Sequence, residues 1–482
     1  SHTSHTSHTS HQANATSTAN ATSTANATNT NNATSTASAT SYRFNDDSSE
    51  DDPETYQKIL EFSMAELKNR HNVSESESDS DEEMGPTEMR IEFIKNLIDD
   101  NQLQPMVDFD APDTETVVSA RLNKKILDVK QLFASMNVKL KYIKSGTTGH
   151  TFKAVSKTDK NKAFAVKVCA YPRDDDYGAM NNIARPENTE LQMLKVLSTL
   201  VVSGKSPHFV LPILCCNTSI TPFINGTRGT IDFEDKRNEI YKKFIERYNK
   251  GEFENFVSVL VCEWCNGGDL LDYIRNNYQN MTLRQWKVIF FQILYTLARI
   301  HEKYPNFKHN DMKANNVLVQ LTNLPSDDFF NYNLDNYKFL IPNVNISVKV
   351  WDFDFACIDG IVNNNKVNSD WTNKMNITSK RNRYYDMHYF FNTLINKRFF
   401  PQFYEGGVPP EIVEFVHRII PNEYRNGSKY VNKKGRLQID VEFTTPYKII
   451  MTDVLFDKYK HKRRKDGSDY REIPSKKTRS KN

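Results

Sequence analysis

Four residues near the middle of the chain have the types and the order that phosphoryl transfer requires. The run His-Asn-Asp-Met-Lys-Ala-Asn-Asn covers residues 309–316, the catalytic loop, and Trp-Asp-Phe-Asp follows at 351–354. Phosphoryl transfer uses an Asp to accept the proton of the attacking hydroxyl and a Lys to offset charge, while an Asn and a second Asp hold Mg²⁺ on the phosphates. The sequence therefore predicts catalytic Asp311 and Lys313, with Asn316 and Asp352 as metal ligands.

A turn upstream of this loop contains two glycines and could cover the phosphates of a nucleotide. It lies between two β-like runs, 140–144 and 151–155, and reads Ser-Gly-Thr-Thr-Gly-His from residue 145. Glycine lets backbone N–H groups approach a phosphate without a Cβ in the way. Lys144 stands where loops of this kind carry a further glycine, and an ordinary hairpin turn is the alternative for the turn taken alone. The predicted nucleotide contacts are Lys144, Ser145, Gly146, Thr147, Thr148, Gly149 and Thr151.

A strand and a helix follow this glycine loop (residues 144–151). The alternating run Ala-Phe-Ala-Val-Lys-Val at 163–168 sets Lys167 among apolar neighbours. A helix-like run then begins at Glu190, which could face Lys167, and Glu187 is the competing partner. We prefer Glu190 because the apolar residues after it continue one buried stripe. The sequence thus predicts that a Lys167–Glu190 pair positions the phosphates of a nucleotide, with Ala165 as a further contact.

A buried-type strand at 257–265 ends at an Asn-Gly-Gly-Asp turn. We call residues 262–269 the connector, because a nucleotide-binding hinge between two halves of the site would lie here. The backbone of Glu263 and Cys265 is expected to be available to adenine, and Cys262 is expected to line the back of the pocket. Cys262 and Cys265 also have Cys-x-x-Cys spacing, but a second Cys pair at zinc spacing is missing from the sequence, so zinc is not predicted.

On these motifs the chain resembles a eukaryotic-type protein kinase from about residue 142 to residue 456. It is more closely similar to the divergent serine/threonine protein kinases of poxviruses and other large nucleocytoplasmic DNA viruses. The features that carry this resemblance are Asp-Phe-Asp-Phe at 352–355, where most kinases have Asp-Phe-Gly, the run Tyr-Tyr-Asp-Met-His-Tyr-Phe-Phe at 384–391, and the long insert between Asn316 and Asp352.

The resemblance implies an α+β fold with two lobes: a small β-rich N-lobe with one key helix, and a larger helical C-lobe. It also implies ATP and Mg²⁺ as cofactors and proteins with Ser or Thr acceptors as partners. Lys313, two residues after the catalytic Asp, is typical of serine/threonine rather than tyrosine kinases. A viral enzyme associated with the virion or with assembly, acting in the host cytoplasm, is the expectation that follows.

Three departures from the general kinase pattern have physical consequences. Asn310 replaces the Arg that receives a phosphate on the activation segment (residues 354–386), so that bidentate partner is absent. Asp354 replaces a flexible Gly, and no Ala-Pro-Glu motif closes the segment before Asp386. Asp386 itself is predicted to accept hydrogen bonds from the backbone of the catalytic loop.

Composition divides the chain into five parts. The start is low in complexity and lacks bulky apolar residues, acidic runs follow, and the end is basic. A basic tail suits nuclear import, nucleic acid or anionic lipid about equally, beside a plain solvated tail. The predicted parts are a disordered N-terminus at 1–45, an acidic linker at 46–90, a partly helical extension at 91–136, a kinase domain at 137–457 and the tail at 458–482.

Two inserts interrupt the kinase pattern, and their role is open. Residues 217–255 have helical spacing through 241–248 and form either a docking surface or a covering helix. Residues 322–345 are rich in Asn, Asp and aromatic residues and predict an ordered surface loop.

The composition of the 482-residue chain agrees with an intracellular enzyme. Six cysteines without a paired framework, and no signal peptide, favour a reducing compartment. No apolar run reaches the ~18 residues of a transmembrane helix. Two alternatives to a protein kinase remain: a small-molecule phosphotransferase of the choline or aminoglycoside type, and a non-catalytic scaffold with the same fold. Lys313 and the Gly-Gly-Asp turn disfavour the first, and the retained Lys167 and metal ligands disfavour the second.

Overall fold

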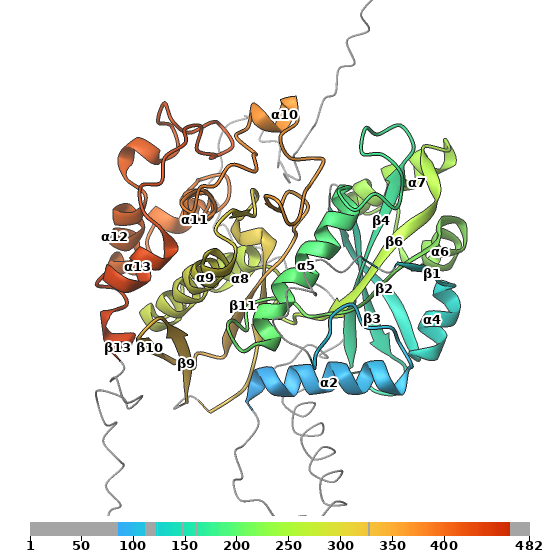
Figure 1. Cartoon of the computed structure of the whole chain (residues 1–482), viewed down its shortest axis with the longest axis horizontal. Helices are drawn as coiled ribbons and strands as arrows, with labels where there is room; N and C mark the ends of the chain where they lie inside the picture. The colour runs from blue at the N-terminus through green and yellow to red at the C-terminus, as the bar shows by residue number, and fades with distance from the viewer. Residues whose placement is uncertain are drawn as a thin grey trace, which may run out of the picture.

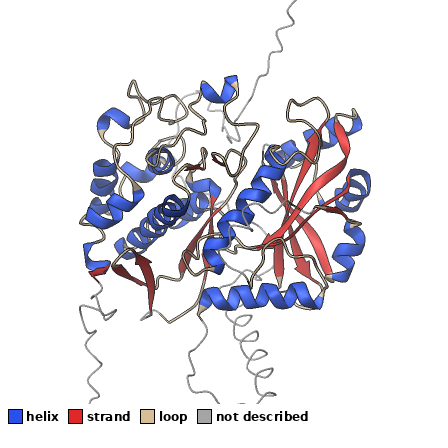
Figure 2. Ribbon diagram, in the orientation of Figure 1, coloured by secondary structure: helices blue, strands red, loops and turns tan. Residues whose placement is uncertain are grey.

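The computed structural model describes residues 85–110, 122, 124–146, 149–160, 162–325 and 328–462. The predicted N-terminus at 1–45, nearly all of the acidic linker and most of the basic tail therefore lie outside the described residues. The described chain is a mixed α/β structure, in which a six-stranded sheet with its helices lies beside a mainly helical part (Figures 1 and 2).

The six strands are ordered β1-β5-β6-β4-β3-β2. β1 runs parallel to β5, and the other neighbours are antiparallel. Most residues of the central strands β4, β5 and β6 are buried, so these strands contribute side chains to the core from both faces of the sheet. The bounds are β1 Lys125–Ile126, β2 Val138–Ser145, β3 His150–Ser156, β4 Ala163–Pro172, β5 Pro212–Ser219 and β6 Phe253–Glu263.

Helices pack around this sheet. α5 (Pro186–Val202) lies between the sheet and the helical part, and α2 (Pro86–Asp100) runs along the edge of the sheet that is at the bottom of Figure 1. The predicted helical spacing at 241–248 falls within α7 (Glu239–Asn249). This helix covers the β2–β3 hairpin through ring contacts of Tyr241, edge-on, and Phe244, tilted, with His150. The remaining helices here are α4 Val129–Ser135 and α6 Ile220–Thr227.

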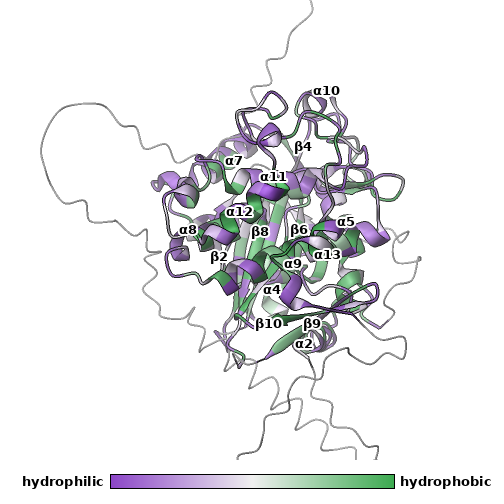
Figure 3. Ribbon diagram, turned by 90° about the vertical axis from the view of Figure 1, so that its left-hand side faces the viewer, coloured by the Kyte–Doolittle hydropathy of each residue, from purple (hydrophilic) through white to green (hydrophobic). Residues whose placement is uncertain are grey.

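The helical part is built on α9 (Leu283–Lys303), whose apolar residues are buried along most of its length. Thr282 begins the helix by accepting the amide hydrogen of Gln285, which the sequence signals as a capping box. Hydrophobic residues gather in the interior of both parts of the molecule (Figure 3). The other helices are α8 Leu270–Asn277, α10 Asp370–Asn373, α11 Tyr385–Leu394, α12 Pro410–Ile419 and α13 Pro446–Thr452.

The expectation of a surface loop at 322–345 is wrong. The insert forms a hairpin of β9 (Phe329–Leu334) and β10 (Tyr337–Pro342), and β13 (Lys460–Lys462), the first part of the basic tail, adds a third strand beside β10. Alternate aromatic and aliphatic residues of the hairpin, such as Tyr332 and Phe339, are buried against α9 through contacts with Phe291. The sequence prediction relied on the high Asn and Asp content, which is typical of turns, and missed the alternation of buried and exposed residues that is typical of strands.

Short strands flank the catalytic loop and fix its ends. β7 (Phe307–Lys308) pairs with β12 (Cys357–Ile358), and β8 (Val317–Leu321) pairs with β11 (Ile346–Val350). Single 3-10 turns complete the described structure: η1 Arg228–Thr230, η2 Lys236–Asn238, η3 Ala314–Asn316, η4 Pro401–Tyr404, η5 Asn422–Tyr424 and η6 Asp457–Tyr459.

Candidate active site

The backbone of the catalytic loop rests on a buried carboxylate from α11. Asp386 accepts hydrogen bonds from the amides of His309, at 2.7 Å, and Asn310, at 2.8 Å, which confirms the predicted contact. Asn310 has a φ of 62°, a backbone conformation that non-glycine residues adopt at a cost. The two hydrogen bonds from backbone amides to Asp386 hold the loop in this conformation. They therefore fix the direction in which the Asp311 side chain projects from the backbone.

Three donors surround the carboxylate of Asp311. Lys313 Nζ lies 3.0 Å from Oδ2, and Asn316 Nδ2 donates to the same oxygen at 2.9 Å. Arg436, which sequence reasoning did not identify, donates to Oδ1. Burial alone would raise the pKa of Asp311, but the charges of Lys313 and Arg436 outweigh it and hold the pKa below its usual value. The carboxylate is therefore ionised and held in one orientation.

A second cluster joins the sheet to the segment after β11. Lys167 on β4 lies 2.5 Å from Glu190 on α5 and 3.1 Å from Asp352. Glu187, the competing candidate, pairs with Arg185 at 3.2 Å instead. Burial opposes the charge of Lys167, but the two carboxylates outweigh it and raise its pKa well above the ordinary value. The predicted Lys167–Glu190 contact is present, and Asp352 is the second carboxylate partner of Lys167.

The two predicted metal ligands fit a hard cation such as Mg²⁺. The amide nitrogen of Asn316 is committed to Asp311, so its carbonyl oxygen is the side-chain atom that remains for a cation. Asp352, with a φ of 64°, presents a carboxylate that is more than one-third exposed even though it contacts Lys167. The Trp351 amide donates to the Asn316 carbonyl at 3.1 Å, which ties the two segments together. Oxygen donors of this kind are the ones that Mg²⁺ prefers.

The glycine loop folds over Lys167. A Cβ on Gly149 would lie 2.9 Å from Cys169 Sγ and 3.1 Å from Lys167 Cε, so a larger residue here would have to displace one of these side chains. Gly146 closes the turn by donating its amide hydrogen to the Gly149 carbonyl at 2.8 Å. Thr151 on β3 lies opposite Lys167 in the sheet. The predicted contacts Thr147 and Thr148 lie outside the described residues.

Two side chains of the glycine loop contact protein groups. Ser145 Oγ lies 2.7 Å from His150 Nδ1 and 2.8 Å from the Tyr142 hydroxyl. Lys144 Nζ lies 3.2 Å from Asp269 Oδ2 at the start of α8, so it spans from the sheet to the helical part. A nucleotide contact from either side chain would have to replace or share these bonds, a constraint that the sequence did not reveal.

The connector is held from outside by Arg90 on α2. The guanidinium pairs with both carboxylate oxygens of Glu263 at 2.8 Å and also donates to the carbonyls of Pro207 and Phe209. Cys262 and Cys265 are buried, and Cys262 pairs with Ala165 across the sheet.

The backbone amide of Glu263 is already paired. It donates to the Leu211 carbonyl at 3.1 Å, so the carbonyl is the Glu263 backbone group that remains for adenine. Strand β5 pairs antiparallel with β6, and Leu211, just before β5, accepts the amide hydrogen at the end of β6. The Glu263 carbonyl and the Cys265 backbone remain the candidate contacts.

Asn310 has a structural role that its position in the motif did not suggest. Its side-chain amide donates to the carbonyls of Phe355, at 3.1 Å, and Thr378, at 3.2 Å, so it joins both ends of the activation segment. Arg383, a cation within the segment that could otherwise pair with a phosphate, pairs with Glu442. The buried Lys308 lies 3.3 Å from the Thr378 hydroxyl. The neutral side chain of Asn310 thus connects Phe355 and Thr378, two distant points of the segment, without a charged group.

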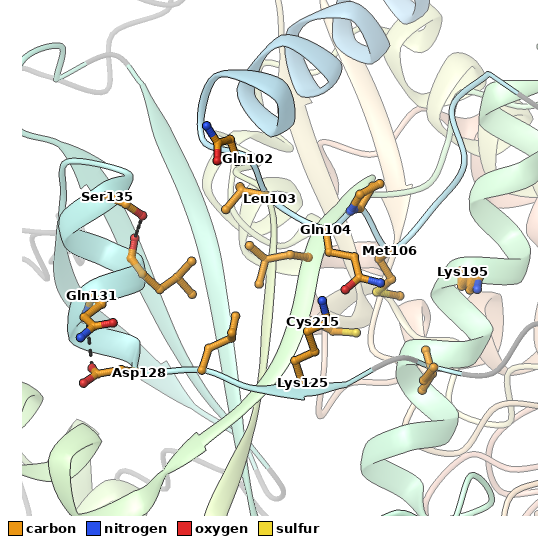
Figure 4. A pocket seen from close by; sticks show the side chains of 15 residues that line it. Gln102, Leu103, Gln104, Met106, Lys125, Asp128, Gln131, Ser135, Lys195 and Cys215 are labelled. Atoms are coloured by element: carbon orange, nitrogen blue, oxygen red, sulfur yellow. Dashed lines mark hydrogen bonds between the residues drawn. The ribbon is translucent and has the colours of Figure 1, made fainter.

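A cavity of about 420 Å³ lies elsewhere, between the loop after α2, α4, α5 and β5 (Figure 4). None of the predicted catalytic, metal or nucleotide residues line it. Its polar lining includes Gln104, Lys125, Asp128, Lys195 and Cys215. Within the described residues, no helix has the length and apolar content to cross a bilayer.

Comparison with known proteins places the chain in a family. The model of the poxvirus serine/threonine protein kinase family matches residues 242–458. A protein of Acanthamoeba polyphaga mimivirus named as a serine/threonine-protein kinase is 59% identical over 418 residues, which cover 86% of this chain and 88% of the relative. The chain belongs to this family of viral serine/threonine protein kinases.

More distant members of this kinase family match shorter parts of the chain. A second mimivirus protein named as a serine/threonine-protein kinase is 26% identical over 298 residues, covering 53% of this chain and 73% of the relative. Serine/threonine-protein kinase 2 of Monkeypox virus is 29% identical over 193 residues, covering 39% of this chain and 38% of the relative.

Proposed function

We propose that this viral kinase-family chain is an active serine/threonine protein kinase that transfers the γ-phosphate of ATP to protein hydroxyls. The observation that carries the proposal is the convergence of two clusters. Asp311 holds Lys313 and Asn316, and Lys167 bridges Glu190 to Asp352. Phosphoryl transfer needs a base, a cation for the phosphates and oxygen ligands for a metal, all fixed in advance. Each of these groups is present with a partner that fixes it.

The proposed architecture is a two-lobed kinase domain at 137–457. The sheet with α5 is the small lobe, the part built on α9 is the large lobe, and the connector joins them. Support comes from the Lys167–Asp352 contact, which links a strand of the sheet to the segment after β11. The ion pair of Lys144 with Asp269 crosses between the same two parts.

The proposed mechanism assigns one task to each residue. Asp311 accepts the proton of the Ser or Thr hydroxyl as its oxygen forms a bond to the γ-phosphorus. The bond from that phosphorus to the β–γ bridging oxygen breaks, and the electron pair leaves with ADP. Lys313 offsets the negative charge that develops on the phosphoryl oxygens. Atoms and charge balance, because the proton on Asp311 is the one lost by the acceptor.

Other residues position the nucleotide. Lys167, oriented by Glu190, binds the α- and β-phosphates, and the backbone of the glycine loop covers them. Asn316 and Asp352 would hold Mg²⁺, which neutralises phosphate charge when bound. The Glu263 carbonyl and the Cys265 backbone contact adenine, with Cys262 and Ala165 lining the pocket. The remaining proposed contacts on the loop and its strand are Lys144, Ser145, Gly146, Thr147, Thr148, Gly149 and Thr151.

The test is direct phosphosite mapping. Purified full chain is incubated with Mg²⁺-ATP and a host-cell or virion extract, and phosphorylated residues are identified by mass spectrometry beside an Asp311→Asn control. We expect new phosphoserine and phosphothreonine with the parent chain but not with Asp311→Asn. Phosphate on choline or aminoglycosides with none on protein would indicate a small-molecule phosphotransferase. No transfer to any acceptor would indicate a scaffold.

We also propose, from the viral relatives, that the chain acts in the infected host cell and associates with the virion. Locating the chain in infected cells and in purified particles tests this.

A further inference from the structure

A tight turn between α12 and α13 brings a buried arginine to the catalytic loop. In this Arg436 turn (residues 430–438), Val431 bridges to Leu437, and the Asn432 amide donates to the Arg436 carbonyl at 2.9 Å. The Gly435 carbonyl accepts a 2.8 Å hydrogen bond from the side chain of Asn392 on α11. The turn is thus attached to the helix whose Asp386 already supports the catalytic loop.

The guanidinium of Arg436 is enclosed by groups of the site. One nitrogen donates to the Asn310 carbonyl and lies 3.2 Å from the Tyr385 hydroxyl, and the other donates to Asp311 Oδ1. The ring of Tyr389 lies 4.2 Å from the guanidinium carbon. Arg436 is only 4% exposed. Its planar donors therefore have one set of partners, and two of these partners belong to the catalytic loop.

The two oxygens of Asp311 have separate partners. Oδ1 accepts from Arg436, whereas Oδ2 lies against Lys313 and Asn316. A carboxylate held at only one oxygen can rotate about the bond to its Cβ. Contacts at both oxygens fix the plane of the group, and with it the direction of the lone pair that accepts the substrate proton.

We propose that Arg436 is a positioning residue for phosphoryl transfer: it fixes Asp311 through Oδ1 so that the remaining lone pairs face the acceptor hydroxyl. The inference rests on the proposed kinase function. Arg436 does not contact Lys167, Glu190 or Asp352 in the structure's hydrogen bonds and ion pairs within the described residues, so it acts on the base and not on nucleotide binding.

The test separates turnover from binding. In Arg436→Lys the charge stays but the second donor direction is lost, and misplacement of a reacting group by about 1 Å costs roughly 10²-fold in rate. We expect kcat to fall ~10-fold or more, with the KM for ATP and the Kd of a nucleotide within ~2-fold of the parent. The matched control is Arg425→Lys, which replaces an arginine of the same region that donates to the carbonyls of Ile420 and His417. That control should keep the parent kcat.

A second variant covers the case in which Arg436→Lys does not fold, as judged by Tm and circular dichroism. Tyr385→Phe keeps the guanidinium and removes only its hydroxyl partner, so kcat should fall roughly 3-fold, the effect of one hydrogen bond. A folded Arg436→Lys with unchanged or higher kcat, or a Tyr385→Phe with unchanged kcat where the first variant fails to fold, overturns the inference. If the parent chain transfers no phosphate, the proposed function is wrong, and so is this inference. An active parent with an inactive Asp311→Asn leaves that function intact whatever Arg436 does.

Discussion

The catalytic loop and the connector are each held by an arginine from a distant part of the chain, but the two arginines act on different kinds of group. Arg436 contacts the carboxylate of Asp311, which performs the proposed chemistry. Arg90 contacts the side chain of Glu263, whose backbone is the part proposed to meet adenine. From this difference we expect loss of the Arg436 contact to lower turnover, and loss of the Arg90 contact to weaken nucleotide binding and destabilise the sheet.

Loss of Lys167, the cation that joins the sheet and α5 to the segment after β11, should have the largest effect. Lys167→Met leaves Glu190 and Asp352 without their common buried partner, and removing one member of a buried ion pair costs about 3–5 kcal/mol. We expect undetectable phosphotransfer, a lower Tm and weaker nucleotide binding. Lys139→Met, at an exposed position on the edge strand β2, is the control and should behave as the parent. Nucleotide binding that stays at the parent level in Lys167→Met would contradict the assignment.

The support of the connector should affect binding more than turnover. Arg90→Met leaves the largely buried Glu263 carboxylate without its cation and removes the hydrogen bonds to Pro207 and Phe209, so the Tm should fall and the KM for ATP should rise several-fold. Lys95, on the same helix, pairs with Asp110, whose side chain is 78% exposed. Lys95→Met is the control and should change neither the Tm nor the KM for ATP. If Arg90→Met instead lowered kcat with an unchanged KM, the contrast between the two arginines would be lost.

The Arg90–Glu263 pair also predicts a dependence of stability on pH. Burial disfavours the Glu263 carboxylate, but Arg90 outweighs it and lowers the pKa below the ordinary 4.5. A depressed folded-state pKa gives stability that is present above the unfolded value and is lost as the pH falls through the folded one. The Tm difference between parent and Arg90→Met should therefore be full at neutral pH and shrink below about pH 4.5. Thermal unfolding of both proteins between pH 7 and pH 3.5 measures it, and a constant difference would count against the pair.

Phosphorylation of the activation segment should have the smallest effect. Asn310 already joins the carbonyls of Phe355 and Thr378 without a phosphate. Phosphatase treatment, and the double change Thr378→Ala with Ser379→Ala, should leave kcat within about 3-fold of the untreated parent, since each removes at most a hydrogen bond or two. A drop of 100-fold in either experiment would show that a phosphate switch exists, and Lys308, beside the Thr378 hydroxyl, would be its first candidate cation.

Features that depend on neighbouring residues could be predicted from the sequence, whereas contacts between residues far apart in the chain could not. The catalytic loop, Glu190 in preference to Glu187, and the contact of Asp386 with the loop follow from local motifs and helical spacing, and the structure contains those contacts. The hairpin at 329–342 was missed because polar turn residues outweighed its alternating pattern.

No sequence motif around Arg90 or Arg436 indicates their contacts. Their partners are 173 and 125 residues away in the chain. Each arginine lies in an ordinary context, an amphipathic helix or a basic turn, where a solvated side chain is the usual expectation. Only the packing of α2 on the connector, and of the turn after α12 on the catalytic loop, brings them to the site.

The most direct test of the central claim is single-turnover phosphotransfer by Asp311→Asn. The substitution keeps the shape of the side chain and one acceptor oxygen, but it removes the proton acceptor and turns the other oxygen into an NH2 group that no longer accepts from Lys313 or Arg436. A positioned base contributes ~10²–10⁴-fold, so the rate at saturating ATP and acceptor should fall by that factor while the Tm and the nucleotide Kd stay close to the parent values. A rate within a few-fold of the parent, in a variant that folds and binds nucleotide normally, would contradict the claim that Asp311 is the base of a protein kinase.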